Sequence, residues 1–385
     1  MESYWPEEGE LRSIEQQAAS IGDPVRKLRY LRAAIRLQPR LAPQSSLRGQ
    51  RYPKPWAYRA AALVAALLAL PAPPSADVDS MLVSVPAKPR PLAEPPPTVW
   101  LVERADDFEH YSNGLRIENL FQVRAEPRGY WRFPLDGLEP GEPQWSREPA
   151  GIVFHSTESH AAEFEPERTG PLRRAGLNLL AYVRQHRSYH FVVDRFGRVH
   201  RIVSESDIAH HAGWSAWSDG NWIYLGLNQS FLAVAFETRT EQGLACLTDA
   251  QVRSGRMLTE MLRARHRIPA VNCVTHAQVS LNPHNRRIAY HTDWASGFPF
   301  AELGLPNNYA LSPAAVLLFG FHYDERLLES GRPGMWQGLQ AAARRLLEEA
   351  SAQGWSVKQY RAVLLRRYQQ LVALAAERDP KEAWP

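Results

Sequence analysis

The sequence predicts an α/β fold for its middle part, with a mixed central β-sheet flanked by helices. Three observations support this prediction. Short apolar runs typical of buried strands alternate with runs of helical period between residues 150 and 310. Polar side chains follow directly after several of the apolar runs, as at the edge of a sheet. Hydrophobic residues make up 44% of the 385 residues, which is enough for a sizeable core.

The expected elements follow from the apolar runs and the residues that interrupt them. Arg195-Phe196-Gly197 has the composition of a turn between two short strands. Thr248 precedes a run of helical period and is therefore expected to cap a helix. In chain order, we expect strands at 151–154, 189–194, 199–203, 231–238 and 271–275, and helices at 170–185 and 248–266.

Ahead of this part, four segments differ in composition. Residues 1–59 are polar and charged, and residues 60–70 form an apolar run that follows several basic side chains. This run is shorter than the ~20 residues of a membrane span, but it has the length of a signal-peptide core. Residues 71–97 are rich in proline, which is typical of an extended linker. Residues 98–148 alternate like strands around Ser112-Asn113-Gly114, so we expect a small β element with a hairpin.

The apolar run leaves two locations open. Export or membrane anchoring through residues 60–70 would place the protein in the cell envelope or periplasm. A buried helix of a cytoplasmic protein is the alternative, because residue 60 is a late start for a cleaved signal. At the other end, residues 310–385 show helical period over 338–350 and 357–377, which predicts a helical C-terminal appendage. The chemistry is therefore expected within residues 149–309.

Composition excludes several functional classes. The net charge is only +4, and no basic stripe with interleaved aromatic residues occurs, so nucleic-acid binding is not expected. The two cysteines, Cys246 and Cys273, could form one disulfide, which the sequence leaves open, but they do not form the CxxC pair of a zinc knuckle. No lysine occurs between Lys88 and Lys358, which excludes a catalytic lysine in the central region.

Three residues on separate segments predict a metal site. His155 ends the apolar run GIVFH, His276 ends AVNCVTH, and Asp293 lies in the irregular segment YHTDW. Two imidazoles and one carboxylate can bind zinc and leave its fourth position open for water. His284 and His291 also lie near Asp293 in the sequence and compete with it as the third ligand.

A carboxylate and a set of aromatic residues complete the candidate site. Glu237 ends the apolar run AVAFE, where a carboxylate is costly unless it is paired or functional. Aromatic side chains could line a groove beside the candidate site, together with arginines, which suit bidentate recognition of carboxylates. The candidates for that groove are Arg195, Trp214, Trp217 and Trp222.

The ordered motifs resemble those of the zinc-dependent N-acetylmuramoyl-L-alanine amidase family, type 2, which shares its fold with peptidoglycan recognition proteins. The matching pieces are FHST, YHFVVDRFGRVHRIV, AHHAGWS, VAFE, VTH and HTDWASGFPF. They cover about residues 150–300. The resemblance implies a zinc hydrolase that cleaves the amide between N-acetylmuramic acid and L-alanine in peptidoglycan or muropeptides.

The resemblance also implies roles for individual residues. His155, His276 and Asp293 would be the zinc ligands. Glu237 would take a proton from the zinc-bound water. Tyr189 would hold the water or the oxyanion.

Substrate binding is implied for other residues of the same motifs. His211, in AHHAGWS, would lie beside the substrate. Trp214 and Arg195 are the groove residues that we expect to contact it.

Two features depart from the family's pattern. Where the family commonly has lysine two residues before its third ligand, this chain has His291, which could donate to the oxyanion or the leaving amine only below its own pKa. Activity would then fall sooner as the pH rises. The insert SLNPHNRRIA also lengthens the distance in sequence between His276 and Asp293.

Two other functions are weighed against the amidase. A peptidoglycan- or muropeptide-binding protein without activity would keep the fold but typically lose a ligand, whereas all three positions here carry competent ligands. An unrelated zinc peptidase would carry HExxH or a similar helical pair, which this chain lacks. The sequence does not distinguish intact wall from recycled fragments as the substrate.

Overall fold

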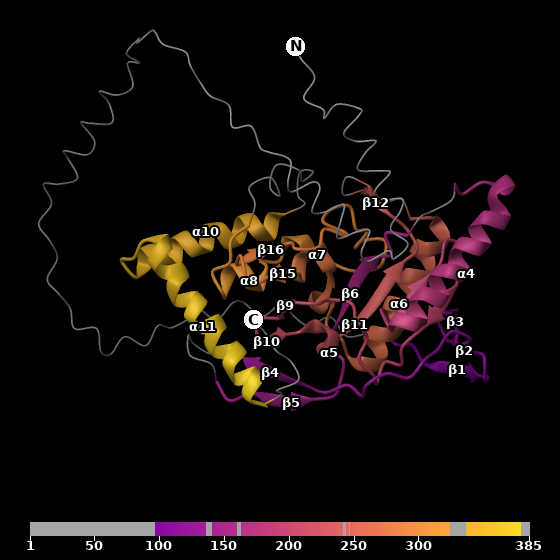
Figure 1. The fold of residues 1–385 in the computed structure, drawn as a ribbon, viewed down its shortest axis with the longest axis horizontal. Coiled ribbons are helices and arrows are strands. Elements are labelled where there is room, and N and C mark those ends of the chain that lie inside the picture. The colour runs from indigo at the N-terminus through magenta and orange to yellow at the C-terminus, as the bar shows by residue number, and fades with distance from the viewer. Residues whose placement is uncertain are drawn as a thin grey trace, which may run out of the picture. The chain divides into compact units, whose positions relative to one another are not determined.

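We describe the protein from a computed structural model (Figure 1). It describes residues 97–135, 141–159, 163–241, 244–245, 247–323 and 336–378. The expected segments 1–59 and 60–70, and the proline-rich linker up to residue 96, lie outside the described residues. None of the helices in the described ranges is both long and apolar enough to cross a membrane. Cys273 is a buried free thiol, and Cys246 lies outside the described residues.

The central sheet is mixed, as expected. Strands β14, β6, β11 and β7 run parallel to one another, whereas β8 is antiparallel to β7 and the first three strands form an antiparallel edge. In spatial order, the strands are β1 (Leu101–Arg104), β2 (Phe108–Tyr111), β3 (Arg116–Glu118), β8 (Val199–Arg201), β7 (Phe191–Val193), β11 (Phe231–Phe236), β6 (Gly151–Ser156) and β14 (Cys273–Thr275).

Helices and short strands surround this sheet. The long helices are α4 (Thr169–His186), α6 (Asp249–His266), α10 (Gln337–Ala352) and α11 (Val357–Arg378). The short helices are η1 (Pro166–Arg168), α5 (Leu227–Ser230), η2 (Ala270–Asn272), α7 (His276–Val279), η3 (Asn308–Ala310) and α8 (Ala314–Leu317). Two small hairpins are formed by β12 (Thr240–Glu241) with β13 (Leu244–Ala245), and by β15 (Leu281–Asn282) with β16 (Arg287–Ile288).

Helices α4 and α6 pack on opposite faces of the sheet. Leu258 of α6 lies in one core cluster with Phe236 of β11, whereas Leu180 of α4 lies in another with Ala235. Neighbouring residues of a strand point to opposite faces, so the two helices cover different sides. Thr248 caps α6 as expected, because its side chain accepts a hydrogen bond from the Gln251 backbone in a capping box.

The expected β element at 98–148 is built into two sheets and does not stand apart. Its hairpin is present, with Gly114 at φ +87° in the turn, and β3 pairs with β8 of the central sheet. The rest of the segment forms half of a second, antiparallel sheet. That sheet contains β5 (Gln144–Ser146), β4 (Tyr130–Pro134), β10 (Trp222–Leu225) and β9 (Ala216–Ser218). A short isolated hairpin is marginally stable, and pairing with further strands supplies what it lacks.

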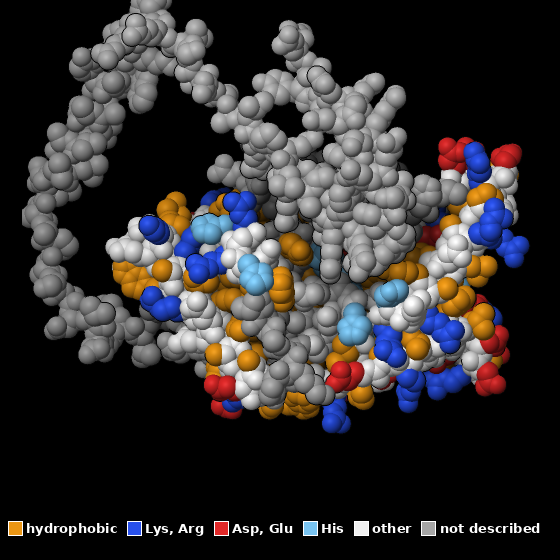
Figure 2. All heavy atoms as spheres, viewed as in Figure 1, with side chains coloured by type: hydrophobic (Ala, Val, Ile, Leu, Met, Phe, Trp, Pro, Cys, Tyr) orange, Lys and Arg blue, Asp and Glu red, His pale blue; other side chains and the backbone are white. Residues whose placement is uncertain are grey.

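The C-terminal helices α10 and α11 form as predicted and share a core with this second sheet. Leu339 of α10 and Leu364 of α11 lie in one cluster with Ile223 and Leu225 of β10. The helices therefore extend the fold instead of forming a loose appendage (Figure 1). On the face drawn in Figure 2, Lys and Arg side chains lie in separate groups and not in one continuous stripe.

Candidate metal centre and active site

The two histidines of the candidate site come from neighbouring parallel strands. His155 is the fifth residue of β6, and His276 follows the last residue of β14 as the first residue of α7. The two strands pair with Thr275 opposite Phe154, so the next residues of both strands lie side by side. The imidazole ring centres are 4.5 Å apart. Parallel pairing thus brings together two ligands that are far apart in sequence.

Asp293 reaches the histidines because the inserted segment folds back on itself. Residues Leu281–Ile288 form the hairpin of β15 and β16. At its base, the Ser280 hydroxyl accepts a hydrogen bond from the His291 backbone N–H and donates one to the His291 carbonyl, each at 3.1 Å. The backbone N–H of Ala277 donates to the Asp293 carbonyl at 3.3 Å. The insert therefore returns the chain to the end of β14.

The ligand atoms of the three residues have the spacing of a zinc site. One Asp293 oxygen is 2.8 Å from Nδ1 of His276, and the other is 3.3 Å from Nδ1 of His155. All three ligand atoms lie within 4.8 Å of one another. Zinc bonds of ~2.0–2.1 Å in a tetrahedron place ligand atoms about 3.3 Å apart. The donor set of two imidazoles and one carboxylate therefore fits zinc in both chemistry and distance.

Electrostatics prepares these residues to act as ligands. Burial, together with the neighbouring His276, lowers the pKa of His155 to about 4. Burial alone would raise the pKa of Asp293, but its contacts with the two imidazoles hold that pKa well below the usual range. At neutral pH the site therefore holds a neutral His155 and an ionised Asp293, and metal binding to these two residues displaces no proton.

His211 lies behind His155, on the ring edge opposite Asp293. Its Nδ1 is 3.1 Å from Nε2 of His155, and the two rings are nearly perpendicular. The amide oxygen of Asn228 accepts hydrogen bonds from the backbone N–H groups of His211 and Ala212, at 2.9 and 2.7 Å, and thereby fixes this loop. Burial and the neighbouring His155 hold the pKa of His211 well below its usual value.

Two further predicted residues also lie against the three ligands. The Tyr189 ring centre is 5.3 Å from that of His155, and burial and the charge of Asp293 raise the Tyr189 pKa. His291 is exposed and stacks on His276, with ring centres 4.6 Å apart. The competing His284 is exposed and packs against Trp214 at 5.0 Å. Within the described ranges, His155, His276 and Asp293 are the residues grouped closely enough to hold a metal ion.

A family model matches part of this chain. Residues 145–293, which include all three candidate ligands, match the model of the N-acetylmuramoyl-L-alanine amidase family. The match covers less than half of the chain. No curated protein matches the chain.

Parts of the chain are also similar to solved structures at low identity. One is AmiD from E. coli, an N-acetylmuramyl-L-alanine amidase in complex with its substrate anhydro-N-acetylmuramic acid-L-Ala-D-γ-Glu-L-Lys (19% identity, 64% of this chain and 96% of that chain, TM-score 0.31). Another is AmpDh3 from Pseudomonas aeruginosa in complex with anhydromuramic pentapeptide (18%, 48% and 72%, TM-score 0.30). A third is Drosophila peptidoglycan recognition protein SD (18%, 35% and 73%, TM-score 0.26).

Glu237 lies beside the backbone of Arg195. It follows β11 directly and is 3% exposed, and its Oε2 accepts a hydrogen bond from the Arg195 backbone N–H at 3.1 Å. Gly176 of α4 faces it, and a Cβ there would lie 3.5 Å from that oxygen. Burial raises the pKa of Glu237. Among the described residues, no hydrogen bond or ion pair joins Glu237 to the three ligands.

The groove residues predicted from the sequence are dispersed in the structure. Trp214 lines a cavity of 1230 Å³ that also contains His291 in its wall. Trp217 is a core residue, 1% exposed, whose indole N–H donates to Asn272, so it cannot line a groove. The Arg195 guanidinium lies over the Phe164 ring at 5.3 Å, and Trp222 packs under Arg132.

No sequence motif points to the other end of this cavity. Trp145, Glu148, Arg265 and His266 line it, and they come from a strand, a loop and the end of a helix. None of them lies in a motif that points to chemistry. Only the packing of these segments brings them together.

Proposed function

We propose that this chain is a zinc-dependent hydrolase that cleaves the amide between N-acetylmuramic acid and L-alanine in peptidoglycan. One observation carries the proposal. His155, His276 and Asp293 converge with ligand atoms within 4.8 Å of one another. The match of residues 145–293 to the amidase family supports the same reaction.

Three residues would bind the metal, and a fourth, His211, would orient one of them. His155 and His276 would bind zinc through Nδ1, and Asp293 through a carboxylate oxygen. When bound, zinc would supply a Lewis acid for the amide carbonyl and a water whose pKa falls toward ~7. His211 would accept a hydrogen bond from Nε2 of His155, which keeps Nδ1 free for the metal.

Glu237 is the proposed general base. Burial raises its pKa, and a carboxylate of raised pKa accepts a proton more readily. Its Oε2 is held by the Arg195 N–H, so a change of rotamer or an intervening water must link it to the reacting amide. Tyr189 and His291, which flank the ligands, are proposed to stabilise the developing oxyanion and to assist the departing amine.

A second candidate is a muropeptide-binding protein without activity. The position of Glu237 favours it, because the acid proposed as the base is hydrogen-bonded to a turn and, among the described residues, forms no hydrogen bond with the ligands. The two candidates differ in a product. The amidase releases stem peptides with new L-alanine amino ends, and the binding protein releases none.

The experiment is to incubate the full chain with peptidoglycan, with and without a chelator, and to measure new L-alanine amino ends. We expect release that the chelator abolishes, and loss of both zinc and release in His155→Ala. Glu237→Gln should retain zinc and lose release. Retained peptidoglycan binding with no release under any condition would overturn the amidase. Full zinc occupancy in Asp293→Ala would remove Asp293 from the ligand set.

We further propose that the substrate lies in the cell envelope, with a cytoplasmic role on recycled fragments as the alternative. Membrane association through residues 60–70 belongs to the same proposal, and these residues lie outside the described ranges. Reporter fusions at each terminus would separate the two locations.

A further inference from the structure

None of the three ligands is among the described residues that line the 1230 Å³ cavity, but the cavity begins beside them. One end is lined by His291, which stacks on the ligand His276, and by Trp214. The other end is lined by Trp145, Glu148 and other residues that no step of the proposed reaction uses. Pockets for small ligands typically measure about 300–1,000 Å³. The cavity therefore has room for more than the two groups joined by the scissile amide.

Trp145 presents a fixed aromatic face at the far end. The side chain is 47% exposed although it lines the cavity. Its ring lies directly against the backbone of Gly129, where any Cβ would overlap it. Trp131 packs edge-on against it, with ring centres 5.2 Å apart. A large exposed indole that packs against Gly129 and Trp131 offers a flat surface on which a ring can stack.

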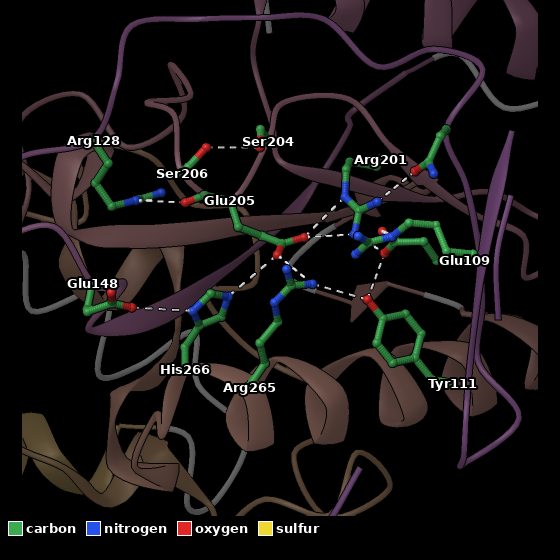
Figure 3. Close-up of polar contacts among 12 residues, drawn as sticks. Glu109, Tyr111, Arg128, Glu148, Arg201, Ser204, Glu205, Ser206, Arg265 and His266 are labelled. Carbon is green, nitrogen blue, oxygen red and sulfur yellow. Dashed lines mark hydrogen bonds and ion pairs between the residues drawn. The ribbon is translucent and has the colours of Figure 1, made fainter. Parts of the chain in front are cut away.

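One buried carboxylate, Glu205, contacts polar groups that line the same cavity (Figure 3). Glu205 forms an ion pair with Arg265 at 3.2 Å and lies 3.6 Å from His266, and His266 in turn faces Glu148 at 3.8 Å. The side chains of Arg265 and Glu148 remain 42% and 82% exposed. Arg265 can therefore donate hydrogen bonds from a position set by Glu205, and the exposed Glu148 can accept them.

The charge of the cavity indicates what kind of ligand it fits. The described residues of its wall include three arginines (Arg128, Arg147, Arg265) and three glutamates (Glu126, Glu148, Glu205), and among them there is neither lysine nor aspartate. With histidine counted as neutral, the formal charges cancel. A cavity without net charge gives no electrostatic advantage to an anion. It suits a neutral ligand rich in hydroxyl and amide groups.

We propose that this end of the cavity is a subsite for the neutral N-acetylated sugars of a glycan strand, with Trp145 as the stacking surface. The inference rests on the proposed function, because it places the muramic acid that carries the scissile amide at the metal site. Neighbouring sugars of the same strand would then extend along the cavity to Trp145, with Glu148 and Arg265 bonding their hydroxyl and acetamido groups. The protein would accordingly prefer linked sugars to a single muropeptide.

The test uses a ligand without a peptide, so that it does not depend on hydrolysis. A β-1,4-linked tetramer of N-acetylglucosamine is titrated into the full chain, with tryptophan fluorescence and calorimetry as readouts. We expect saturable binding that weakens about tenfold in Trp145→Ala, as expected for loss of a stacked aromatic contact of about 1.4 kcal/mol. Trp145→Phe should retain most of the binding. Trp355→Ala is the matched control, because Trp355 is 39% exposed and lies outside the cavity.

Each outcome decides between the possibilities. Absence of tetramer binding, or equal binding by Trp145→Ala and the wild type, would overturn the subsite. Preferential binding of poly-γ-glutamate over the tetramer would overturn the argument from charge. Tetramer binding without release of stem peptides would refute the proposed amidase and leave the subsite standing. Release of stem peptides without tetramer binding would overturn the subsite and support the amidase. If Trp145→Ala does not fold, Trp145→Leu, which keeps an apolar side chain but no ring, gives the same comparison.

Discussion

The metal site and the Glu205 cluster, which is Glu205 with Arg201, Arg265 and His266, both place a carboxylate among basic side chains. They differ in the charge of those side chains. Asp293 meets two imidazoles, and burial keeps His155 neutral. Glu205 meets the guanidinium groups of Arg201 and Arg265, which are always charged.

This difference determines what each cluster can do. Burial alone would raise the pKa of Glu205, but His266, Arg201 and Arg265 hold it well below the usual range, so its charge is fully balanced. Around Asp293 the partners are two imidazoles, and burial keeps His155 neutral, so a cation bound there would balance the carboxylate charge. The Glu205 cluster stiffens the fold. The metal site is suited to hold a cation.

The largest effect is expected from Glu205→Ala. The change leaves Arg201 with one fewer carboxylate and removes the anchor of Arg265 and His266. Breaking a buried ion pair by removing one partner costs about 3–5 kcal/mol. Urea unfolding should show this loss, while zinc affinity stays unchanged. Glu118→Ala, which removes an exposed pair with Arg116, is the control and should cost less than about 1 kcal/mol. A loss of zinc in Glu205→Ala would show that the two clusters are coupled.

Zinc itself should have the next largest effect. A ligand that binds only the folded state stabilises it by about 2.7 kcal/mol when its free concentration is 100 times its Kd. Thermal unfolding of the wild type should therefore shift upward with zinc and return with a chelator. His276→Ala should not respond, whereas His284→Ala, which changes an exposed histidine outside the site, should respond like the wild type. An equal response by His276→Ala would place the zinc elsewhere.

His211 gives the smallest of the three effects and separates two roles. Because its Nδ1 faces Nε2 of His155, we expect His211→Ala to weaken zinc binding about 10–100-fold. His211→Asn, which can still accept a hydrogen bond, should recover part of that affinity. Competition with a chromophoric chelator measures both. Unchanged zinc affinity with a raised KM would instead support the role predicted from the sequence, in which His211 contacts substrate.

The sequence predicted the parts of the site that strand ends determine. His155 and His276 follow apolar runs, and parallel strands bring such positions to one edge of a sheet. The capping box at Thr248 and the hairpin at Gly114 could also be predicted, because residues close in sequence determine them. Asp293 was harder to assign, since nothing in the sequence shows that a hairpin closes the insert.

Other features depend on packing alone and left no pattern in the sequence. Residues 98–148 alternate like any half-buried strands, and their partners β8 and β10 are distant in the chain. Trp145 differs from Trp217 only in what surrounds it, yet one is half exposed and the other is in the core. The sequence indicates Glu237 as a buried carboxylate at a strand end, but its hydrogen bond with the Arg195 backbone depends on how two distant segments pack.

Ser280 closes the base of the excursion that β15 and β16 form, and this closure affects how many residues the excursion can contain. Because Ser280 bonds both backbone groups of His291, the excursion starts and ends at one point. The position of Asp293 is then independent of how many residues lie between the two ends. Residues at the exposed tip, such as Asn285 and Arg286, could be duplicated, deleted or replaced by an affinity tag without disturbing the ligands. The tip is therefore an attachment point close to the metal centre.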